Sequence, residues 1–318
     1  MILLSEWMDD QGLDLLRQIP DTVVYEPEAW SDPIVLADLA ADADALIVRN
    51  NTRVTASFLD QAPLLKVIGR LGVGLDNIDL DACQARRITV VYARGANAIA
   101  VVEYVLQALL YSARPWIDWT HRTKQGAWQR RLGGGEVYGK VLGVVGMGDI
   151  GSRVARAGRQ LGMQVLSYDP HLAPFHALIA DGTVSAANTL EELLASSDAV
   201  TLHAPLRPET YHLLDSQALA SVKHGSVLIN TARGALIDEE ALVEQLEKQQ
   251  LRHVFLDVRE SEPPALPDRL AAFSQVHLTP HLAGLTNEAL GRTTALVLED
   301  VVRVLTGRPP RSPVRWRH

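Results

Sequence analysis

The chain has 318 residues, of which 47% are hydrophobic and 21% are charged, and its net charge is −8. This length exceeds that of most single domains, so two domains are expected, and the composition is that of an ordinary globular protein. The basic residues are scattered except in GRPPRSPVRWRH (307–318), which we interpret as a solvated terminus. Nucleic-acid binding is therefore not favoured.

The sequence gives no indication of export, membrane insertion or a metal site. MILLSEWMDD, the N-terminus, carries acidic residues where a signal peptide needs a positive flank. The longest apolar region, AIAVVEYVLQALLY (98–111), is interrupted by Glu103 and Gln107 and is too short to cross a bilayer, so it predicts a buried helix. The single cysteine, Cys83, can form no intrachain disulfide and lacks partners for a metal, so a reducing cytoplasm fits best.

Short apolar runs alternate with helix-like segments along the first part of the chain. These runs are ILL (2–4), TVVY (22–25), ALIV (45–48), LKVIG (65–69) and ITVVY (88–92). A repeated strand–helix rhythm predicts a parallel sheet. The segment 98–111 then has a helical period of apolar residues.

After LGGGEVYGK (132–140) a second series begins. It contains VLGVV (141–145), QVLSY (164–168), DAVTLH (198–203), SVLIN (226–230), HVFLDV (253–258) and QVHLT (275–279), and a helical segment, 287–305, follows. Six strands alternating with helices predict a doubly wound sheet. We therefore expect an α/β protein with two Rossmann-like or flavodoxin-like domains. The cofactor domain, 98–284, would be inserted into a substrate domain of 1–97 plus 285–318, with ligand in the cleft between them.

The first strand of the second series runs into GMGDIG, which places Gly146, Gly148 and Gly151 in G-x-G-x-x-G spacing before a helix. The glycines permit a tight turn, backbone approach to a pyrophosphate and close helix–strand packing. Asp169 follows the next strand, 18 residues after Gly151, and a carboxylate there accepts hydrogen bonds from ribose hydroxyls and repels a 2′-phosphate. NAD is therefore favoured over NADP. The alternative is a glycine-rich turn with a helix-capping aspartate. Asp149 lies inside the loop, and we expect its carboxylate to point to solvent.

Three polar segments follow predicted strands of the second series: NTARGALID (230–238), LDVRESEPP (256–264) and LTPHLAG (278–284). Ligands of open α/β sheets bind at the carboxyl ends of strands. These segments should therefore bring Arg233, Asp257, Glu262 and His281 to one crevice. Taken singly, Arg233 could be a helix cap or surface charge, Glu262 a loop acid and His281 a satisfied core group.

With these motifs in order, the chain resembles the D-2-hydroxyacid dehydrogenase family over nearly its whole length. The stretches that carry the resemblance are GRLGVGLDNIDLDAC, GANAIAVVEY, VVGMGDIG, LHAPLRPET, INTARGALIDEEAL, LDVRESEPP and LTPHLAG. The resemblance implies that Arg233 binds the substrate carboxylate and carbonyl oxygen, that Glu262 orients His281 and favours its protonated form, and that His281 is the acid/base. This fits the chemistry, because hydride transfer to a 2-oxo carbon leaves an alkoxide that needs a proton. A guanidinium suits bidentate carboxylate binding.

The resemblance also implies further cofactor contacts. They come from the backbone of Asp149 and Ile150, from His203, Ala204 and Pro205, from Thr210, from Thr231 and Ala232, from Asp257 to the nicotinamide carboxamide, and from Ala283 and Gly284, which leave room for the ring. His203 is expected to be a strand-end residue beside the adenine. The sequence departs from the family pattern at Arg259, where many members have an aromatic residue, and at Arg94. Both can alter the charge of the cleft.

Two arginines of the first domain suggest the substrate. Arg49 and Arg70 match positions at which members resembling phosphoglycerate dehydrogenase bind a distal phosphate. The backbone N–H groups of Leu71, Gly72, Val73 and Gly74 should meet the substrate carboxylate. We therefore predict an anionic small molecule, a 2-hydroxy acid of the 3-phosphoglycerate or 3-sulfolactate type. Both arginines could instead cap helices or form surface salt bridges.

Other functions and the oligomeric state stay open at this point. A glyoxylate or hydroxypyruvate type of reductase and a non-enzymatic, NAD-sensing corepressor-like protein are alternatives. PWIDWTHRTKQGAWQRR (115–131) looks like the dimer arm of the family, which predicts a homodimer, although an ordinary amphipathic helix would read similarly.

Overall fold

The computed structural model describes residues 1–131, 133–173 and 176–314. The chain divides into two compact units, which are described separately. Unit 1 contains Met1–Asn97 and Leu285–His318, and unit 2 contains Ala98–Gly284. Of the basic terminus interpreted above as solvated, residues 315–318 lie outside the described residues.

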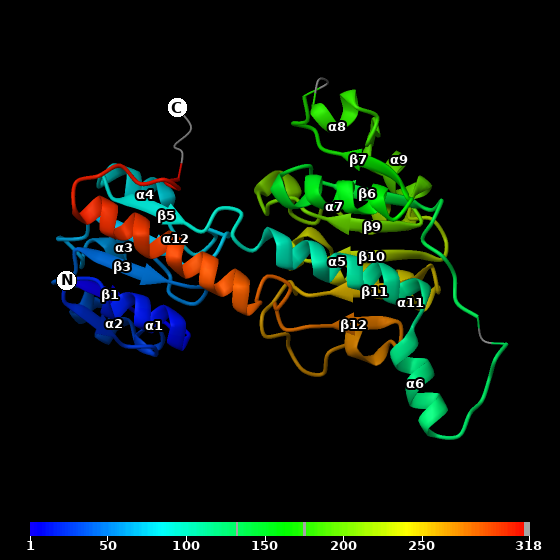
Figure 1. Cartoon of the computed structure of the whole chain (residues 1–318), viewed down its shortest axis with the longest axis horizontal. Helices are drawn as coiled ribbons and strands as arrows, with labels where there is room; N and C mark the ends of the chain where they lie inside the picture. The colour runs from blue at the N-terminus through cyan, green and yellow to red at the C-terminus, as the bar shows by residue number, and fades with distance from the viewer. Residues whose placement is uncertain (132, 174–175, 315–318) are drawn as a thin grey trace. The chain divides into compact units, whose positions relative to one another are not determined.

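Unit 1 is built on a five-stranded parallel sheet of order β2-β1-β3-β4-β5 (Figure 1). Its strands are β1 (Ile2–Leu4), β2 (Val23–Tyr25), β3 (Ala45–Val48), β4 (Val67–Arg70) and β5 (Thr89–Tyr92). Each falls on one of the apolar runs of the sequence, so these five strand predictions are confirmed. Residues of β1, β3 and β4 are buried throughout, as expected for parallel strands covered on both faces.

Helices cover both faces of this sheet. They are α1 (Asp10–Arg17), α2 (Pro33–Ala40), α3 (Ala56–Leu59), α4 (Leu80–Ala85) and α12 (Asn287–Leu305), with the short 3-10 turn η1 (Ala29–Ser31). Several begin at a side chain that caps the first turn: Asp9 accepts from Gly12, Asp79 from Ala82 and Thr286 from Ala289. The predicted helix at 287–305 is confirmed, and it returns the chain to unit 1, where it packs on β4 and β5.

Unit 2 contains a seven-stranded parallel sheet of order β12-β11-β10-β9-β6-β7-β8 (Figure 1). The strands are β6 (Val141–Val145), β7 (Gln164–Tyr168), β8 (Ser185–Ala186), β9 (Ala199–Leu202), β10 (Ser226–Asn230), β11 (Leu251–Leu256) and β12 (Val276–Leu278). The six predicted strands are all present. The seventh, β8, was missed because it has two residues, both exposed, and therefore no apolar run.

Two hydrophobic layers sandwich this sheet. One face carries α5 (Ala98–Ala113) and α7 (Asp149–Gln160), and the other carries α9 (Leu190–Ser196), α10 (Ser216–Ala220) and α11 (Glu239–Glu247). The remaining elements are α6 (Trp116–Lys124), α8 (Ala177–Ala180), η2 (Pro208–Thr210), η3 (Gly234–Leu236) and η4 (Leu270–Ala272). Strand order reverses between β6 and β9, and this switch point is where open α/β sheets bind ligands. Within the described ranges no helix is long and apolar enough to span a bilayer.

Candidate active site

Three neighbouring strands of unit 2 bring the predicted catalytic side chains to one edge of the sheet. Arg233 follows β10, Glu262 lies in the loop after β11, and His281 lies in the turn after β12. Because β10, β11 and β12 are adjacent and parallel, their carboxyl ends share that edge. The structure therefore assembles all three residues within unit 2.

A direct hydrogen bond joins two of them. His281 Nδ1 lies 2.8 Å from Glu262 Oε2, and the two side chains are 39% and 41% exposed. Burial alone would raise the pKa of Glu262, but the hydrogen bonds from His281 and the Arg259 amide, with the charge of Arg233, hold that pKa below its ordinary value. The carboxyl is therefore ionised at neutral pH and can only accept, so His281 Nδ1 carries the proton. This leaves Nε2 as the ring atom that can exchange a proton.

The lowered pKa of Glu262 also makes the free energy of unfolding depend on pH. Folding favours the ionised carboxyl, so its stabilising contribution is present above the pKa of the unfolded chain and is lost as the pH falls through the lower folded value. Since the side chain is partly exposed, solvent screens this contribution and it is small.

Arg233 is placed by the turn that ends β10. Asn230, which is fully buried, accepts from the Ala232 amide at 3.0 Å and donates to the Arg233 carbonyl at 2.8 Å. The guanidinium Nη1 of Arg233 donates to the Ala232 carbonyl at 2.6 Å. The sequence reasoning did not single out Asn230, although an asparagine at the last position of a buried strand is a signal for such a turn.

Asp257 is a buried carboxylate that holds the turn carrying His281. One oxygen accepts from the Thr279 hydroxyl at 2.6 Å and the Leu282 amide at 2.7 Å, and the other accepts from the Ala283 amide at 2.8 Å. The backbone carbonyl of Asp257 accepts from the His281 amide at 2.8 Å. Two carboxylate oxygens offer about four acceptor sites, so one further donor can still bind.

His281 itself has φ of +58°, a left-handed conformation that is uncommon for a residue with a side chain. Such a conformation persists only where neighbouring contacts determine it. Asp257 supplies those contacts on both sides of His281, at Thr279 and at Leu282 and Ala283. The backbone conformation of His281 therefore depends on a buried residue that precedes it by 24 positions.

The glycine loop after β6 fits a dinucleotide pyrophosphate. Gly146 has φ of +90°, and a Cβ there would lie 2.8 Å from the backbone of His203. A Cβ on Gly151 would lie 1.9 Å from the Gly146 carbonyl oxygen, so α7 can approach the loop only without a side chain at that position. A Cβ on Gly148 would meet nothing within 4 Å, so the surface beside the start of α7 is open to an anion.

The acidic residues near this loop have distinct roles. Asp169 follows β7 and accepts from the Met147 amide at 2.8 Å and the His171 amide at 2.9 Å, so it helps to order the glycine loop. Asp149 pairs with Arg153 at 2.9 Å, and its side chain is half exposed. The prediction that the Asp149 carboxylate points to solvent is confirmed.

Other predicted cofactor residues lie at the ends of β9 and β10. His203 Nε2 lies 3.0 Å from the Thr201 hydroxyl, and burial lowers the pKa of His203 to about 3, so the ring is neutral. The Thr210 hydroxyl donates to the Pro205 carbonyl at 2.6 Å and accepts from the Arg207 amide at 2.8 Å, which fixes the turn after β9. The Thr231 hydroxyl is buried without a hydrogen-bond partner among the described residues, so a bound ligand could satisfy it.

In unit 1, Arg70 is the last residue of β4 and is 7% exposed. Its Nη1 donates to the Leu71 carbonyl at 2.8 Å and its Nη2 to Asn50 Oδ1 at 2.6 Å. A Cβ on Gly72 would lie 2.1 Å from Nη1, so the loop 71–74 folds closely over this guanidinium. Asn50, which the sequence reasoning missed, thus helps to orient Arg70.

Arg49 follows β3 and packs on an indole. Its guanidinium carbon lies 5.1 Å from the centre of the Trp7 ring, a cation–π contact. Buried Glu6 accepts from the backbone amides of Arg49, Asn51 and Thr52, which fixes this loop. Burial lowers the pKa of Arg49, against the opposing charges of Glu6 and Asp9. No sequence signal linked Glu6 to residues more than 40 positions away.

The described ranges contain no group of three His, Cys, Asp or Glu side chains that could hold a metal ion. Cys83 is buried, and burial raises the pKa of its thiol to about 11, so it is an unreactive core residue.

The fold agrees with comparisons to known proteins. Residues 106–283 match the family model of the D-isomer specific 2-hydroxyacid dehydrogenase, NAD binding domain. The chain is 42% identical to (S)-sulfolactate dehydrogenase of Chromohalobacter salexigens, over 96% of this chain and 98% of that protein. It is 38% identical to D-3-phosphoglycerate dehydrogenase of Synechocystis, over 98% of this chain but 55% of that protein. The crystal structure of the TT0316 protein from Thermus thermophilus has a TM-score of 0.90 at 34% identity, covering 99% of each chain.

The chain therefore belongs to the D-isomer specific 2-hydroxyacid dehydrogenase family. It is an NAD-dependent oxidoreductase that interconverts a 2-hydroxy acid and its 2-oxo acid. The chain spans about half the length of the phosphoglycerate dehydrogenase and nearly all of the sulfolactate dehydrogenase.

The role of Asp257 as the anchor of the His281 turn can be tested with Asp257→Asn. An amide NH₂ would face one of three backbone or hydroxyl donors, so the free energy of unfolding should fall by about 1–3 kcal/mol. The amides of Leu282 and Ala283 should also exchange faster with solvent, as measured by hydrogen exchange. Asp215→Asn is a matched control, because Asp215 caps α10 and asparagine caps equally well. Unchanged protection at Leu282 and Ala283 would contradict the anchoring role.

Proposed function

We propose that Arg233, Glu262 and His281 carry out the acid–base part of the reaction. In the reducing direction, His281 Nε2 donates a proton to the 2-oxo oxygen while Glu262 holds the opposite ring nitrogen. In the oxidising direction, the neutral ring accepts the hydroxyl proton at the same atom. Arg233 binds the substrate carboxylate and polarises the carbonyl. The observation that carries this proposal is the 2.8 Å contact of His281 with Glu262, beside a cationic Arg233.

NAD, when bound, supplies or accepts the hydride at C4 of its nicotinamide. We propose that the loop 146–151 holds the pyrophosphate and that Asp169 accepts from the ribose hydroxyls. Asp257 has one acceptor site left for the carboxamide. The remaining contacts are proposed at Ile150, His203, Ala204, Pro205, Thr210, Thr231, Ala232, Ala283 and Gly284. The buried Thr231 hydroxyl and the open surface beside Gly148 support this assignment.

We further propose that the substrate carries a second anionic group, as 3-sulfolactate does. Arg49 and Arg70, at the ends of β3 and β4, would bind that group, and the backbone of 71–74 would bind the substrate carboxylate. Similarity to a sulfolactate dehydrogenase over 98% of its length supports a sulfonate. The similarity to phosphoglycerate dehydrogenases makes 3-phosphoglycerate the second candidate.

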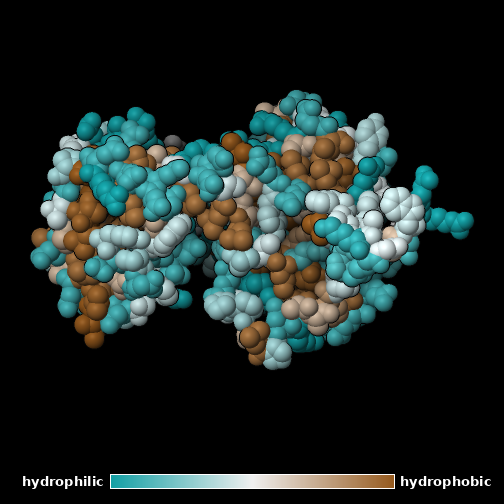
Figure 2. Space-filling view, turned by 60° about the horizontal axis from the view of Figure 1, so that its bottom comes forward, coloured by the Kyte–Doolittle hydropathy of each residue, from teal (hydrophilic) through white to brown (hydrophobic). Residues whose placement is uncertain are grey.

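An apolar surface of unit 2 supports a homodimer. Helix α6 has no buried residue, and Trp116 and Ile117 on it are 62% and 52% exposed. A groove of about 700 Å³ lies beside it, lined by α5, α6 and residues 135–138. Figure 2 shows patches of hydrophobic residues, in brown, among the hydrophilic residues of the surface, in teal. We propose that a second copy covers this groove, since two-fold symmetry lets one chain present both an exposed apolar arm and its receptor.

We also propose a cytoplasmic location. The single cysteine, Cys83, is buried and free, which agrees with a reducing compartment.

Changing His281 to Ala tests the acid–base role. Turnover should fall by about 10²- to 10⁴-fold, because the proton donor is lost, while NADH binding measured by fluorescence changes little. His224→Ala is the control, because His224 is an exposed histidine of unit 2 that precedes β10 and so lies away from the carboxyl ends of the strands. Retention of more than about a tenth of the wild-type rate by His281→Ala would refute the assignment. Wild type that binds NADH yet turns over no acid would support the NAD-sensing alternative instead.

The second anionic group is tested with Arg49→Met on a panel of acids. 3-sulfolactate, 3-phosphoglycerate, lactate, glycerate and malate are each assayed with NAD and NADP. Loss of the guanidinium should lower kcat/KM for the two acids with an anionic C3 group by roughly 10- to 100-fold, and for lactate by much less. Arg53→Met, a change at an exposed neighbouring arginine, should leave both unchanged. Equal losses for sulfolactate and lactate would remove the argument for a charged tail.

The homodimer is tested with Ile117→Glu. Placing a carboxylate on α6 should convert the wild-type dimer to monomer in sedimentation equilibrium at micromolar concentration, because the charge would be buried unpaired. Ile34→Glu is the control, since Ile34 is 74% exposed but lies in unit 1. A monomeric wild type, or a dimeric Ile117→Glu protein, would count against this interface.

A further inference from the structure

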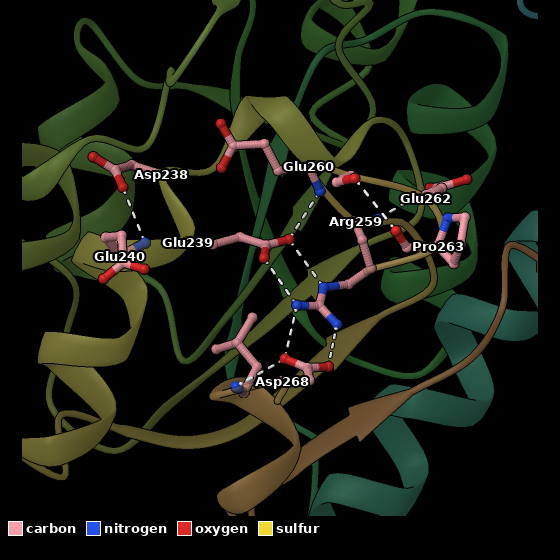
Figure 3. Close-up of polar contacts among 10 residues, drawn as sticks. Asp238, Glu239, Glu240, Arg259, Glu260, Glu262, Pro263 and Asp268 are labelled. Carbon is pink, nitrogen blue, oxygen red and sulfur yellow. Dashed lines mark hydrogen bonds and ion pairs between the residues drawn. The ribbon is translucent and has the colours of Figure 1, made fainter. Parts of the chain in front are cut away.

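Arg259 is the residue that departs from the aromatic pattern of the family, and its side chain lies between two carboxylates (Figure 3). Nε and Nη2 donate to the two oxygens of Glu239, each at 2.9 Å. Nη1 and Nη2 donate to the two oxygens of Asp268 at 2.6 and 3.0 Å. The guanidinium is thus bound bidentately on two edges, the geometry for which arginine is suited and lysine is not.

These three residues, the Arg259 cluster, are largely withdrawn from solvent. The side chains of Arg259 and Asp268 are each 9% exposed, and that of Glu239 is 21% exposed. Hydrogen bonds to Glu239, and then those to Asp268, raise the pKa of Arg259, and the hydrogen bonds from Arg259 lower the pKa of Asp268. Arg259 was expected to be able to alter the charge of the cleft, and the structure shows its charge buried and paired with two carboxylates. Arg94, the second departure, is an exposed residue of unit 1.

The cluster connects to Glu262 through the backbone. The Arg259 amide donates to Glu262 Oε1 at 3.0 Å, and the other oxygen of Glu262 binds His281. The next amide, that of Glu260, donates to Glu239 Oε1 at 2.8 Å. Glu239 is the first residue of α11. The Arg259 side chain and the Glu260 amide therefore both connect the loop after β11 to that helix.

The same loop also touches the segment that carries Arg233. A Cβ on Gly234 would lie 1.8 Å from the Arg259 carbonyl carbon and 2.3 Å from the Glu260 nitrogen. The backbone at 259–260 therefore packs directly against the residue after Arg233. A shift of Arg259 would change the placement of Glu262 and of Arg233 together.

We propose that Arg259 is a positioning residue of the active site: clasped by Glu239 and Asp268, it fixes the loop from which its own amide orients Glu262 toward His281. This rests on the proposed roles of Glu262 and His281. The Arg259 cluster holds the loop with four directional hydrogen bonds, whereas an aromatic ring at this position would hold it by packing alone. Asp268 acts through Arg259, whereas Glu239 binds both Arg259 and the Glu260 amide.

The test compares Arg259→Leu, Glu262→Gln and their double variant with wild type. Arg259→Leu should lower kcat by roughly 10- to 100-fold, with the Kd of NADH nearly unchanged, because the catalytic pair is misplaced while the glycine loop is untouched. The double variant should be no slower than Glu262→Gln, since both changes break one linkage. The pH profile of kcat/KM for Arg259→Leu should take the shape of the Glu262→Gln profile. The assay follows oxidation of 3-sulfolactate by NAD, or of lactate if wild type accepts only the shorter acid.

A readout without turnover separates this inference from the proposed function. Hydrogen exchange of the peptide at 258–264 should show faster exchange of the Arg259 and Glu260 amides in Arg259→Leu than in wild type. Arg269→Leu is the matched control, because Arg269 pairs with Glu240 and Glu247 of the same helix without binding the loop. It should leave exchange at 258–264 and the pH profile as in wild type.

The proposal is overturned if Arg259→Leu keeps wild-type exchange at these amides, or if its rate loss multiplies with that of Glu262→Gln at an unchanged pH profile. That pattern would mean a role in overall stability alone. Should Arg259→Leu not fold, Arg259→Lys and Glu239→Gln replace it, each leaving one carboxylate bound. Both variants should show smaller changes in kcat, in the pH profile and in hydrogen exchange at 258–264. Wild-type values of all three in both variants would refute the proposal.

Discussion

The buried carboxylate of Asp257 is the group on which the conformation of the His281 turn depends. Asp257 follows β11, and its carboxylate accepts three hydrogen bonds from the turn that follows β12. That turn forces His281 into a left-handed conformation, which costs free energy and must be offset by its surroundings. Because Asp257 binds residues on both sides of His281, the backbone of His281 can move only if this buried carboxylate loses its partners. Losing such partners costs more than the strain that they maintain.

Each ionic group beside the site has a partner of opposite charge or a hydrogen-bond donor. Arg259 is bound by Glu239 and Asp268, and Glu262 receives donors at both of its oxygens. Buried ion pairs of this kind add little net stability, but removing one partner is costly, so they restrict the loop to one conformation. Neutral His203 adds no charge beside the glycine loop. The charge of Arg233 acts on Glu262 and lowers the pKa of that carboxyl, so Arg233 is part of the same electrostatic environment.

Local sequence patterns were sufficient for the framework and for the prediction that Arg233, Glu262 and His281 lie at one edge of a sheet. Parallel strands are continuous apolar runs, so eleven of them could be read from the sequence, whereas exposed two-residue β8 could not. Arg233, Glu262 and His281 were found because each follows a strand in a compact motif. The supporting contacts were not found, since they join distant positions: Glu239 with Arg259, and Glu6 with the loop after β3. Arg259 shows the limit most clearly, because a sequence reveals a charge but not the two carboxylates that bury it.

In the proposed function, the two arginines of unit 1 bind an anionic group of the substrate, and the charge of that group depends on its chemistry. A sulfonate carries a single negative charge at physiological pH, whereas a phosphate monoester carries about −1.5 to −2. Arg70 already donates to Asn50 and to the Leu71 carbonyl, and Arg49 is held over the Trp7 ring and loses part of its hydration. These contacts fix the direction in which each guanidinium presents its charge. In the proposed function the two arginines would therefore place the C3 group as well as offset its charge, and a sulfonate has less charge to offset than a phosphate.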